Sequence, residues 1–272
     1  TGQPELDPET LYDLVDAQGR KEYDVRDLLK AVIDRDSFQE VKAEYGQSIV
    51  CGFAKIGGHR VGIVANQRQR SMSEKGGLQI GGVIYADSAD KAARFVMDCN
   101  QTRVPIVFIQ DVMGFMVGKA SEQEGIIRSG AKLVNALSNA VVPKITIIVG
   151  GSYGAGNYAM CGKAYDPRFI FAWPNAKYAV MGAEQASGVI FDINKKAAER
   201  AGAHLDETEL NQLRQKVHDA YRQKTDIRWG AARGWIDGII APDMTREILV
   251  KCLKLVERPS PDFRYKTGVL QT

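Results

Sequence analysis

The sequence has 272 residues, of which 44% are hydrophobic and 25% charged, and its formal net charge is +3. This composition is typical of a globular domain, and a small charge spread along the chain gives no indication of nucleic-acid binding. No apolar run reaches the roughly 18 residues that a membrane-spanning helix requires.

The two ends of the chain and its cysteines bound its cellular context. Residues 1–22 are a polar, acidic lead-in without the pattern of a signal peptide, and the first residue is not Met, so we expect a processed chain or a fragment. The four cysteines lie far apart and form no Cys-x-x-Cys pair, which predicts no metal site. Buried free thiols indicate a reducing compartment, the cytoplasm or the mitochondrial matrix.

Strands and helices alternate along the chain, each recognised by the spacing of its apolar residues. We expect helices over 25–33, 86–101, 123–139, 183–191, 206–225, 227–233 and 245–256, and strands over 49–56, 60–66, 105–110, 145–149, 169–173, 177–181 and 235–240. Residues 68–82 and 111–118 read as loops. This order predicts one α/β domain with parallel strands and a helical annex at its C-terminal end, after about residue 190.

The stretch from Val141 to Met160 is the most informative of the sequence. A β-branched run at 145–149 predicts a buried strand, four glycines then follow within residues 150–156, and a helix can begin at Asn157. Unpaired N–H groups at a helix start, together with the helix dipole, form an anion or oxyanion site made of backbone. The alternative is a tight strand-to-helix connection that binds nothing.

A second glycine loop strengthens the site hypothesis. Gly114 and Phe115 follow the strand at 105–110, just as Gly150 to Gly156 follow the strand at 145–149. Neighbouring parallel strands would bring both loops to the same edge of the sheet, where α/β proteins bind ligands. A carbonyl oxygen between the two loops could then accept hydrogen bonds from both.

Side chains suited to acid–base catalysis are scarce near these loops. The three histidines, His59, His204 and His218, are all distant in sequence from the glycine stretch. Asp111 is either an acid or base or a residue that caps its loop, and Cys161 is expected to be a small core residue. This scarcity favours stabilisation by backbone donors.

Together these residues resemble the C-terminal half of the carboxyltransferase (beta) subunit of biotin-dependent acyl-CoA carboxylases. The motifs that carry the resemblance are Tyr23-Asp-Val-Arg26, Asp36-Ser-Phe38, Tyr45-Gly46, Gly62-Ile-Val-Ala-Asn66, Gly114-Phe-Met-Val-Gly118, Gly150-Gly-Ser-Tyr-Gly-Ala-Gly-Asn-Tyr-Ala-Met160, Arg168-Phe169, Trp173-Pro-Asn-Ala176, Val180-Met-Gly-Ala-Glu-Gln185, Gly238-Ile-Ile-Ala-Pro242 and Thr245-Arg246. The match covers residues 23–258, with 259–272 as a C-terminal tail. Gly-Ala-Gly-Asn-Tyr158 and Met160-Cys-Gly-Lys-Ala-Tyr165 are most similar to the methylcrotonyl-CoA carboxylase type.

The resemblance implies a crotonase-like (ClpP/crotonase) spiral of ββα units and transfer of a carboxyl group from carboxybiotin, carried on a partner protein, to an acyl-CoA. Negative charge develops on the ureido oxygen of biotin, and the freed biotin nitrogen can take the acyl-CoA proton, so no strong protein base is needed. By motif match, Gly154 and Ala155 would donate to the ureido oxygen, with Gly114 and Phe115 opposite. The residues that would shape the cofactor pocket are Gly150, Gly151, Tyr153 and Gly156.

The resemblance also implies partners, because a complete family subunit has two such halves and the first one largely binds the acyl-CoA. We expect an N-terminal half on a separate chain or missing segment, biotin carrier and biotin carboxylase components, and a homo-oligomer, a trimer or hexamer. Three alternatives remain open. They are a biotin-dependent decarboxylase of the glutaconyl-CoA type, coupled to a membrane only if part of a pump, a stand-alone crotonase-type hydratase or isomerase, and a non-catalytic assembly module.

Overall fold

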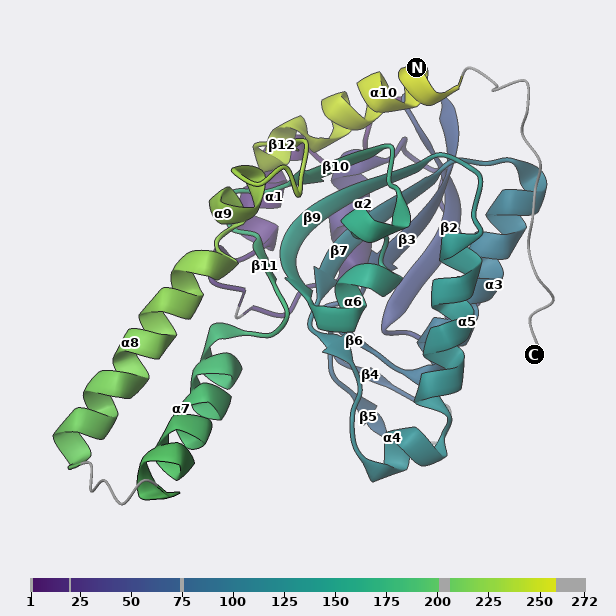
Figure 1. Ribbon diagram of the computed structural model, residues 1–272. Helices are drawn as coiled ribbons and strands as arrows, with labels where there is room; N and C mark the ends of the chain where they lie inside the picture. The colour runs from purple at the N-terminus through teal and green to yellow at the C-terminus, as the bar shows by residue number, and fades with distance from the viewer. Residues whose placement is uncertain (1, 20, 74–75, 201–205, 258–272) are drawn as a thin grey trace.

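The computed structural model describes residues 2–19, 21–73, 76–200 and 206–257, and a mixed β-sheet lies at its centre (Figure 1). Its strands are β1 (Gln39–Glu40), β2 (Ile49–Ile56), β3 (His59–Asn66), β7 (Ile106–Val112), β9 (Lys144–Tyr153), β10 (Phe169–Ala172), β11 (Lys177–Ala179) and β12 (Gly238–Ile239). The spatial order is β1-β2-β3-β7-β9-β10-β12, and β11 pairs with the end of β9. The hairpin β2–β3 is antiparallel, whereas β3, β7, β9, β10 and β12 run parallel, which confirms the predicted α/β organisation.

Alternation along each strand explains why the sheet is buried on both faces. In β9, Ile145, Ile147 and Val149 pack into one core cluster, while Thr146 and Ile148 point to the other side. Both faces need cover, as is usual for parallel sheets whose strands read as continuous apolar runs.

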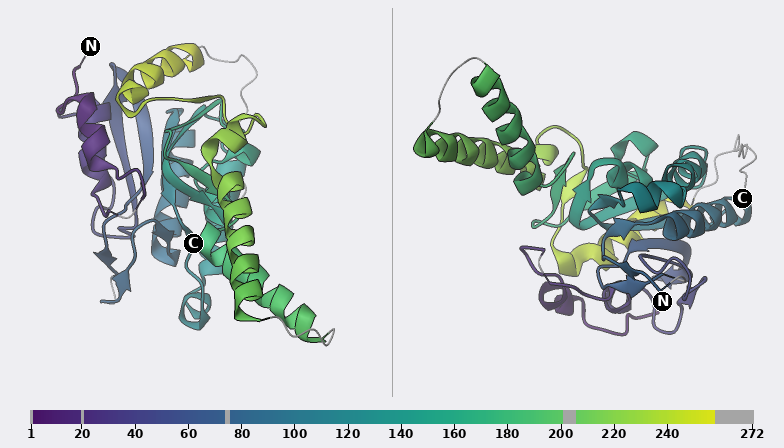
Figure 2. Two further views of the ribbon diagram at one scale, coloured as in Figure 1. Left: turned by 90° about the vertical axis from the view of Figure 1, so that its left-hand side faces the viewer. Right: turned by 90° about the horizontal axis from the view of Figure 1, so that it is seen from below.

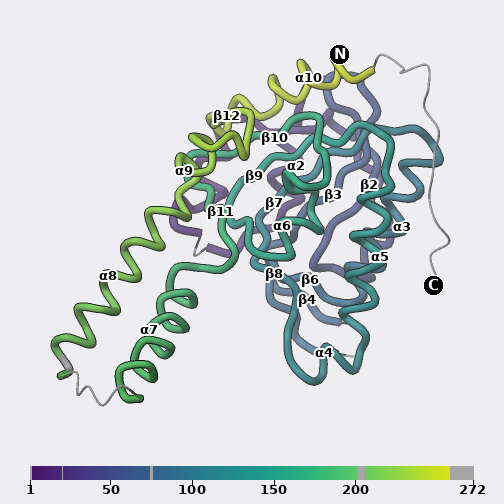
Figure 3. The backbone as a smooth tube through the Cα atoms, in the orientation of Figure 1, coloured from purple at the N-terminus to yellow at the C-terminus, as the bar shows by residue number. Residues whose placement is uncertain are grey.

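Helices supply that cover in two layers (Figures 1 and 3). The helices are α1 (Leu11–Leu14), α2 (Val25–Val32), α3 (Ala86–Thr102), α4 (Lys119–Gln123), α5 (Ile126–Ser138), α6 (Gly154–Ala159), α7 (Ala183–Arg200), α8 (Glu207–Thr225), α9 (Ile227–Ala231) and α10 (Thr245–Val256), with 3₁₀ turns at Pro8–Thr10, Lys163–Tyr165 and Pro242–Met244. Leu11 of α1, Leu28 of α2 and Leu249 of α10 pack into the core on one face. Phe95 of α3 and Leu133 of α5 pack, together with α6, into the core on the other.

The pair α7–α8 projects away from the sheet, as the two turned views make plain (Figure 2). The guanidinium of Arg214 on α8 lies 5.9 Å from the ring centre of Phe191 on α7, so the two helices pack mainly on each other. The predicted C-terminal helical annex therefore takes the form of an extended helix pair, followed by α9, β12 and α10. No helix among the described residues is both long and apolar enough to cross a bilayer.

Several predicted boundaries are wrong, and the error that matters most for the site lies in the central strand. We expected the strand to end at Val149, but β9 continues to Tyr153 because β7 and β11 pair with its last residues on either side. Gly150 and Gly151 therefore lie in a strand, and the helix begins at Gly154 rather than Asn157.

Other differences lie away from the glycine stretch. Helix α7 runs nine residues past its predicted end, to Arg200. The helix expected over 123–139 begins only at Ile126, after Gly125, whose φ of +89° interrupts helical geometry, and the separate helix α4 precedes it. The expected loop 68–82 contains the short antiparallel strands β4 (Ser71–Met72) and β5 (Leu78–Gln79). The lead-in 1–22 contributes Leu11 and Val15 to the core, and the predicted tail 259–272 lies outside the described residues.

Candidate active site

Both predicted glycine loops lie at the same edge of the sheet. β7 and β9 are adjacent and parallel, and a register shift after Gln110 brings Val112 opposite Ser152. β7 leads into the short strand β8 (Gly114–Phe115), which pairs with β6 (Val83–Ile84), and β9 leads directly into α6. The prediction that the topology brings these loops together is confirmed.

The two loops touch through Gly156. A Cβ atom on Gly156 would lie 2.6 Å from Cγ2 of Val112 and 3.0 Å from Cα of Gly114, distances too short for a side chain. Phe115 packs in turn on α5, where a Cβ on Gly130 would lie 3.0 Å from the Phe115 ring. Glycine at position 156 therefore allows α6 to approach the first loop closely.

The start of α6 leaves backbone donors at an accessible position. Gly154 adopts φ +53°, Tyr153 is the extended N-cap residue, and no side chain caps the helix. The first N–H groups of a helix have no partner inside it, and the helix dipole adds partial positive charge at this end. Gly154 is partly exposed and Ala155 exposed, so these donors can meet a ligand.

The first loop also leaves its backbone open to approach. Gly114 has φ +136° and is partly exposed, and a Cβ placed on it would meet nothing within 4 Å. The backbone conformation, rather than a lack of space, is what favours glycine here.

A buried polar network fixes α6 on the sheet. The Ser152 hydroxyl donates to Oε1 of Gln110 at 2.6 Å, and Nδ2 of Asn157 donates to the Ser152 oxygen at 2.6 Å. Nε2 of Gln110 donates to the Met160 carbonyl at 2.7 Å, and the Tyr178 hydroxyl donates to Oδ1 of Asn157 at 3.3 Å. These contacts tie the end of β9, the whole of α6 and β11 into one unit.

Asp111 forms a second buried network behind the glycine stretch. Its Oδ1 accepts from the Gly151 N–H at 2.7 Å, while Oδ2 accepts from the Tyr23 hydroxyl at 3.1 Å and lies 3.2 Å from Nε of Arg68. Burial raises the pKa of Asp111, against the opposing effects of Arg68, Gly151 and Tyr23. Burial, followed by the nearby charge of Asp111, also raises the pKa of Tyr153.

The sequence did not indicate most of these supporting residues. Tyr23 and Arg68 meet Asp111 from distant positions, and no local pattern predicts either contact. Gln110 did carry a signal that we did not use, since a polar residue directly follows the apolar run 106–109, and the structure buries both Gln110 and Asp111.

Two of the three histidines lie away from the glycine loops. His59 pairs with Glu257, and His218 lies beside Asp219 on α8, whereas His204 lies outside the described residues. Cys161 is buried, and burial raises the pKa of its thiol to about 12, which fits a core residue. The described residues contain no cluster of three or more His, Cys, Asp or Glu side chains that could hold a metal ion.

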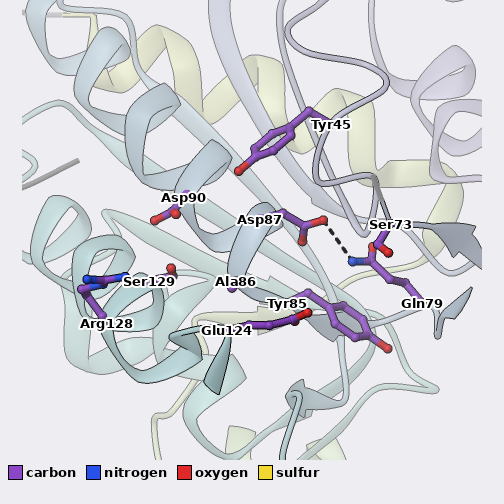
Figure 4. A pocket seen from close by; sticks show the side chains of 10 residues that line it. All are labelled: Tyr45, Ser73, Gln79, Tyr85, Ala86, Asp87, Asp90, Glu124, Arg128 and Ser129. Carbon is purple, nitrogen blue, oxygen red and sulfur yellow. Dashed lines mark hydrogen bonds between the residues drawn. The ribbon is translucent and has the colours of Figure 1, made fainter. Parts of the chain in front are cut away.

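A cavity of about 220 Å³ lies elsewhere, between the start of α3 and the α4–α5 junction (Figure 4). It is lined by Tyr45, Ser73, Gln79, Tyr85, Ala86, Asp87, Asp90, Glu124, Arg128 and Ser129. Its acids are engaged, since Asp87 accepts from Gln79 at 3.0 Å and Asp90 pairs with Lys132 at 3.2 Å. None of the predicted site residues lines this cavity, so the glycine loops remain the candidate site.

The comparisons with known proteins agree on one family. The family model described as "Carboxyl transferase domain" matches residues 1–268. A probable mitochondrial methylcrotonoyl-CoA carboxylase beta chain of Drosophila melanogaster is 43% identical over 252 residues, which are 93% of this chain and 41% of that protein. This chain thus spans less than half the length of the relative it matches.

Solved structures agree with the sequence comparisons. The beta subunit of geranyl-CoA carboxylase from P. aeruginosa aligns with a TM-score of 0.82 and 35% identity, covering 100% of this chain and 48% of that one. The transcarboxylase 12S subunit, solved as a hexamer with methylmalonyl-coenzyme A bound, aligns with a TM-score of 0.83 and 36% identity, covering 99% and 48%. The predicted crotonase-like fold is confirmed by these similarities.

Proposed function

Because the chain belongs to the carboxyl transferase domain family, we propose that it forms the carboxybiotin-binding half of an acyl-CoA carboxyltransferase active site. The observation that carries the proposal is the close approach of Gly156 to Gly114. It places the uncapped start of α6 next to the partly exposed Gly114–Phe115 segment, so that in this proposal backbone groups of both face one ligand.

The residues at this edge fit the ureido group of biotin. Small residues leave the main chain approachable, since Ala155 is exposed and Gly114 has open space where a Cβ would stand. Carboxybiotin, when bound, supplies the carboxyl group, and its ureido oxygen gains negative charge as that group departs. In this proposal the N–H groups of Gly154 and Ala155 hold that charge, and Gly114 and Phe115 provide donors opposite them.

The remaining predicted residues take supporting roles in the proposal. Gly150 and Gly151 keep the end of β9 free of side chains beside Asp111, and the Tyr153 ring lies against Gly151, where a Cβ would be 2.9 Å from Cε2. Gly156 sets the distance between the loops. Loss of one oxyanion donor of this kind costs about 3 kcal/mol of barrier, at least 100-fold in rate.

The site contains no side chain placed as a strong base. The Asp111 carboxylate is buried and already accepts two hydrogen bonds, and among the described residues no histidine lies at this edge. This is the arrangement expected where the protein supplies positioning and charge stabilisation and a bound group takes the proton.

The proposal extends to substrate and partners through the relatives. We assign an enoyl-CoA such as 3-methylcrotonyl-CoA as the carboxyl acceptor, since the Drosophila and P. aeruginosa relatives are named for branched enoyl-CoA substrates. The acyl-CoA would be bound by an N-terminal half, and carboxybiotin would arrive on a carrier charged by a biotin carboxylase. A homo-oligomer is expected because the transcarboxylase 12S subunit is a hexamer, and the mitochondrial matrix or cytoplasm is the expected compartment.

Carboxyl transfer from free carboxylated biotin derivatives, measured with this chain, a candidate N-terminal half and a panel of acyl-CoAs, tests the proposal. We expect activity that requires both chains and is lost in Gly154→Val, because φ at this position is +53° and a Cβ there would lie 2.8 Å from the Val180 carbonyl oxygen. Hydration or isomerisation of an enoyl-CoA by this chain alone, without biotin, would contradict it and favour a crotonase-type enzyme.

A further inference from the structure

The Asp111–Arg68 pair links the two glycine loops, although neither side chain is needed for the donors themselves. Asp111 belongs to β7, three residues before Gly114, so its backbone carries the first loop. Its carboxylate accepts from the N–H of Gly151, three residues before Gly154 in the second loop. Asp111 is thus part of the strand that leads into the first loop, and its side chain holds the backbone that leads into the second.

Arg68 extends this link to the strand that supports Gly114. Its side chain is 11% exposed and donates from Nη1 to the Gly81 carbonyl at 3.4 Å. A Cβ on Gly82 would lie 2.5 Å from Nη1 of Arg68, so the guanidinium rests directly on this residue. The Gly82 carbonyl in turn accepts from the Met113 N–H at 2.7 Å, and β6 then pairs with β8.

Taking the proposed function as its basis, we propose that the buried Asp111–Arg68 ion pair sets the separation and relative orientation of the two glycine loops. Asp111 and Arg68 are positioning residues that act through the backbone of Gly151 and Gly82. Tyr23 assists by donating a hydrogen bond from its hydroxyl to Oδ2 of Asp111, the same oxygen that faces Arg68.

The physical consequence of breaking the pair is a shift of the loops rather than loss of a reacting group. A buried charge left without its partner is strongly unfavourable, so the segments around it rearrange to admit water or move apart. A displacement of about 1 Å at reacting atoms can cost about 100-fold in rate. Binding of the acyl-CoA, which the N-terminal half provides, should change much less.

The test compares this pair with a matched one on the far side of the fold. Asp34 and Arg246 form an ion pair with nearly the same burial, 6% and 13% exposed against 7% and 11% for Asp111 and Arg68. In the active complex with an N-terminal half, we expect Asp111→Asn to lower kcat about 100-fold, with KM for acyl-CoA within about threefold. Asp34→Asn should lower the unfolding temperature with kcat unchanged.

A readout other than activity follows the loops directly. Backbone amide NMR shifts and hydrogen exchange of this chain should change at Gly114, Gly151 and Gly154 in Asp111→Asn and stay the same in Asp34→Asn. If the single variant does not fold, Asp111→Asn with Arg68→Gln leaves no lone buried charge and serves in its place. The double variant is expected to show the same amide changes and reduced kcat.

The possible outcomes separate this inference from the proposed function. If the complex of the native chain with an N-terminal half transfers no carboxyl group, the proposed function is overturned. The amide signals of Gly114, Gly151 and Gly154 would still decide whether Asp111 positions the loops. If the native complex is active, but Asp111→Asn keeps a kcat within threefold of native and its amide signals do not shift, only the positioning role is overturned. Equal loss of kcat in Asp111→Asn and Asp34→Asn would also overturn it, because the effect would then be one of general stability.

Discussion

The sheet edge at the ends of β7 and β9 differs in construction from the projecting pair α7–α8. At the edge, Gln110, Asp111 and Ser152 are all buried and hydrogen-bonded to groups of the neighbouring loop. Along α7 the buried residues are Ala186 and Ser187, while apolar side chains such as Ile193, 60% exposed, face outward. The backbone donors of the proposed site therefore lie where side chains hold the chain from several sides, whereas the helix pair has few such contacts.

Paired substitutions of glycine should give the largest contrast between these regions. Gly156→Val places a side chain against Val112 and Gly114 and separates the loops, so we expect carboxyl transfer to fall about 100-fold or more. A Cβ added to Gly188 on α7 would meet nothing within 4 Å, and Gly188→Ala should leave activity unchanged. Steady-state kinetics of both variants, each with the N-terminal half, would check this, and equal activity of the two would remove the distinction.

Replacing one glutamine in each region by alanine compares how much the two regions contribute to stability. Gln110→Ala removes the partner of Ser152 and of the Met160 carbonyl in a buried site, and we expect it to lower the free energy of unfolding by about 3 kcal/mol. Gln215 on α8 donates to exposed Asp219, so Gln215→Ala should change stability by less than about 0.5 kcal/mol. Urea unfolding measures both, and a loss at Gln110 no larger than at Gln215 would contradict the bracing role of the network.

The two regions should also respond to pH in opposite directions. Burial raises the pKa of Asp111, so the folded state binds this proton more tightly than the unfolded state. Its contribution to stability therefore falls as pH rises from about 3.9 through the raised pKa. The Arg228 side chain lowers the pKa of Asp226, between α8 and α9, to about 2, so that contribution is present above about pH 3.9 and is lost as pH falls toward 2.

Unfolding measured across pH for the native chain, Asp111→Asn and Asp226→Asn separates these contributions. We expect the difference in free energy of unfolding between the native chain and Asp226→Asn to shrink below about pH 3.9. The free energy of unfolding of the native chain relative to Asp111→Asn should instead fall as pH rises above about 3.9. Parallel pH profiles for all three proteins would show that neither carboxyl titrates differently on folding.

The smallest predicted effect concerns the helix pair alone. Because glycine in a helix interior is about 0.5–1 kcal/mol less favourable than alanine, Gly188→Ala should stabilise the chain by up to that amount. Thermal unfolding would detect it as a rise in the midpoint. A fall in the midpoint would contradict this prediction and the open space found around Gly188.

The local pattern of apolar residues predicted the strands and helices and the edge at which the two glycine loops meet, but not the contacts that hold the loops in place. Apolar runs located β7 and β9, and their parallel order was enough to bring Gly114 and Gly154 to one edge. The extension of β9 through two glycines could not be predicted, since it depends on β7 and β11 pairing with residues that are poor strand formers.

The long-range polar contacts likewise could not be predicted from the sequence. Asp111 meets Tyr23 and Arg68 only because β3 and the segment before α2 converge behind β7, and no spacing along the chain encodes that convergence. The fit of Gly156 against Gly114 is similar, because a glycine that permits close approach looks the same in sequence as one that permits a turn.

Removal of a single backbone donor tests the oxyanion proposal most directly. Ala155→Pro deletes one N–H in the first turn of α6, where proline is tolerated, and Ala86→Pro makes the same change in the first turn of α3 as a control. With an N-terminal half present, we predict that Ala155→Pro lowers the rate of carboxyl transfer about 100-fold while Ala86→Pro stays near the native rate. A rate for folded Ala155→Pro within threefold of native would contradict the claim that this backbone group stabilises the developing charge.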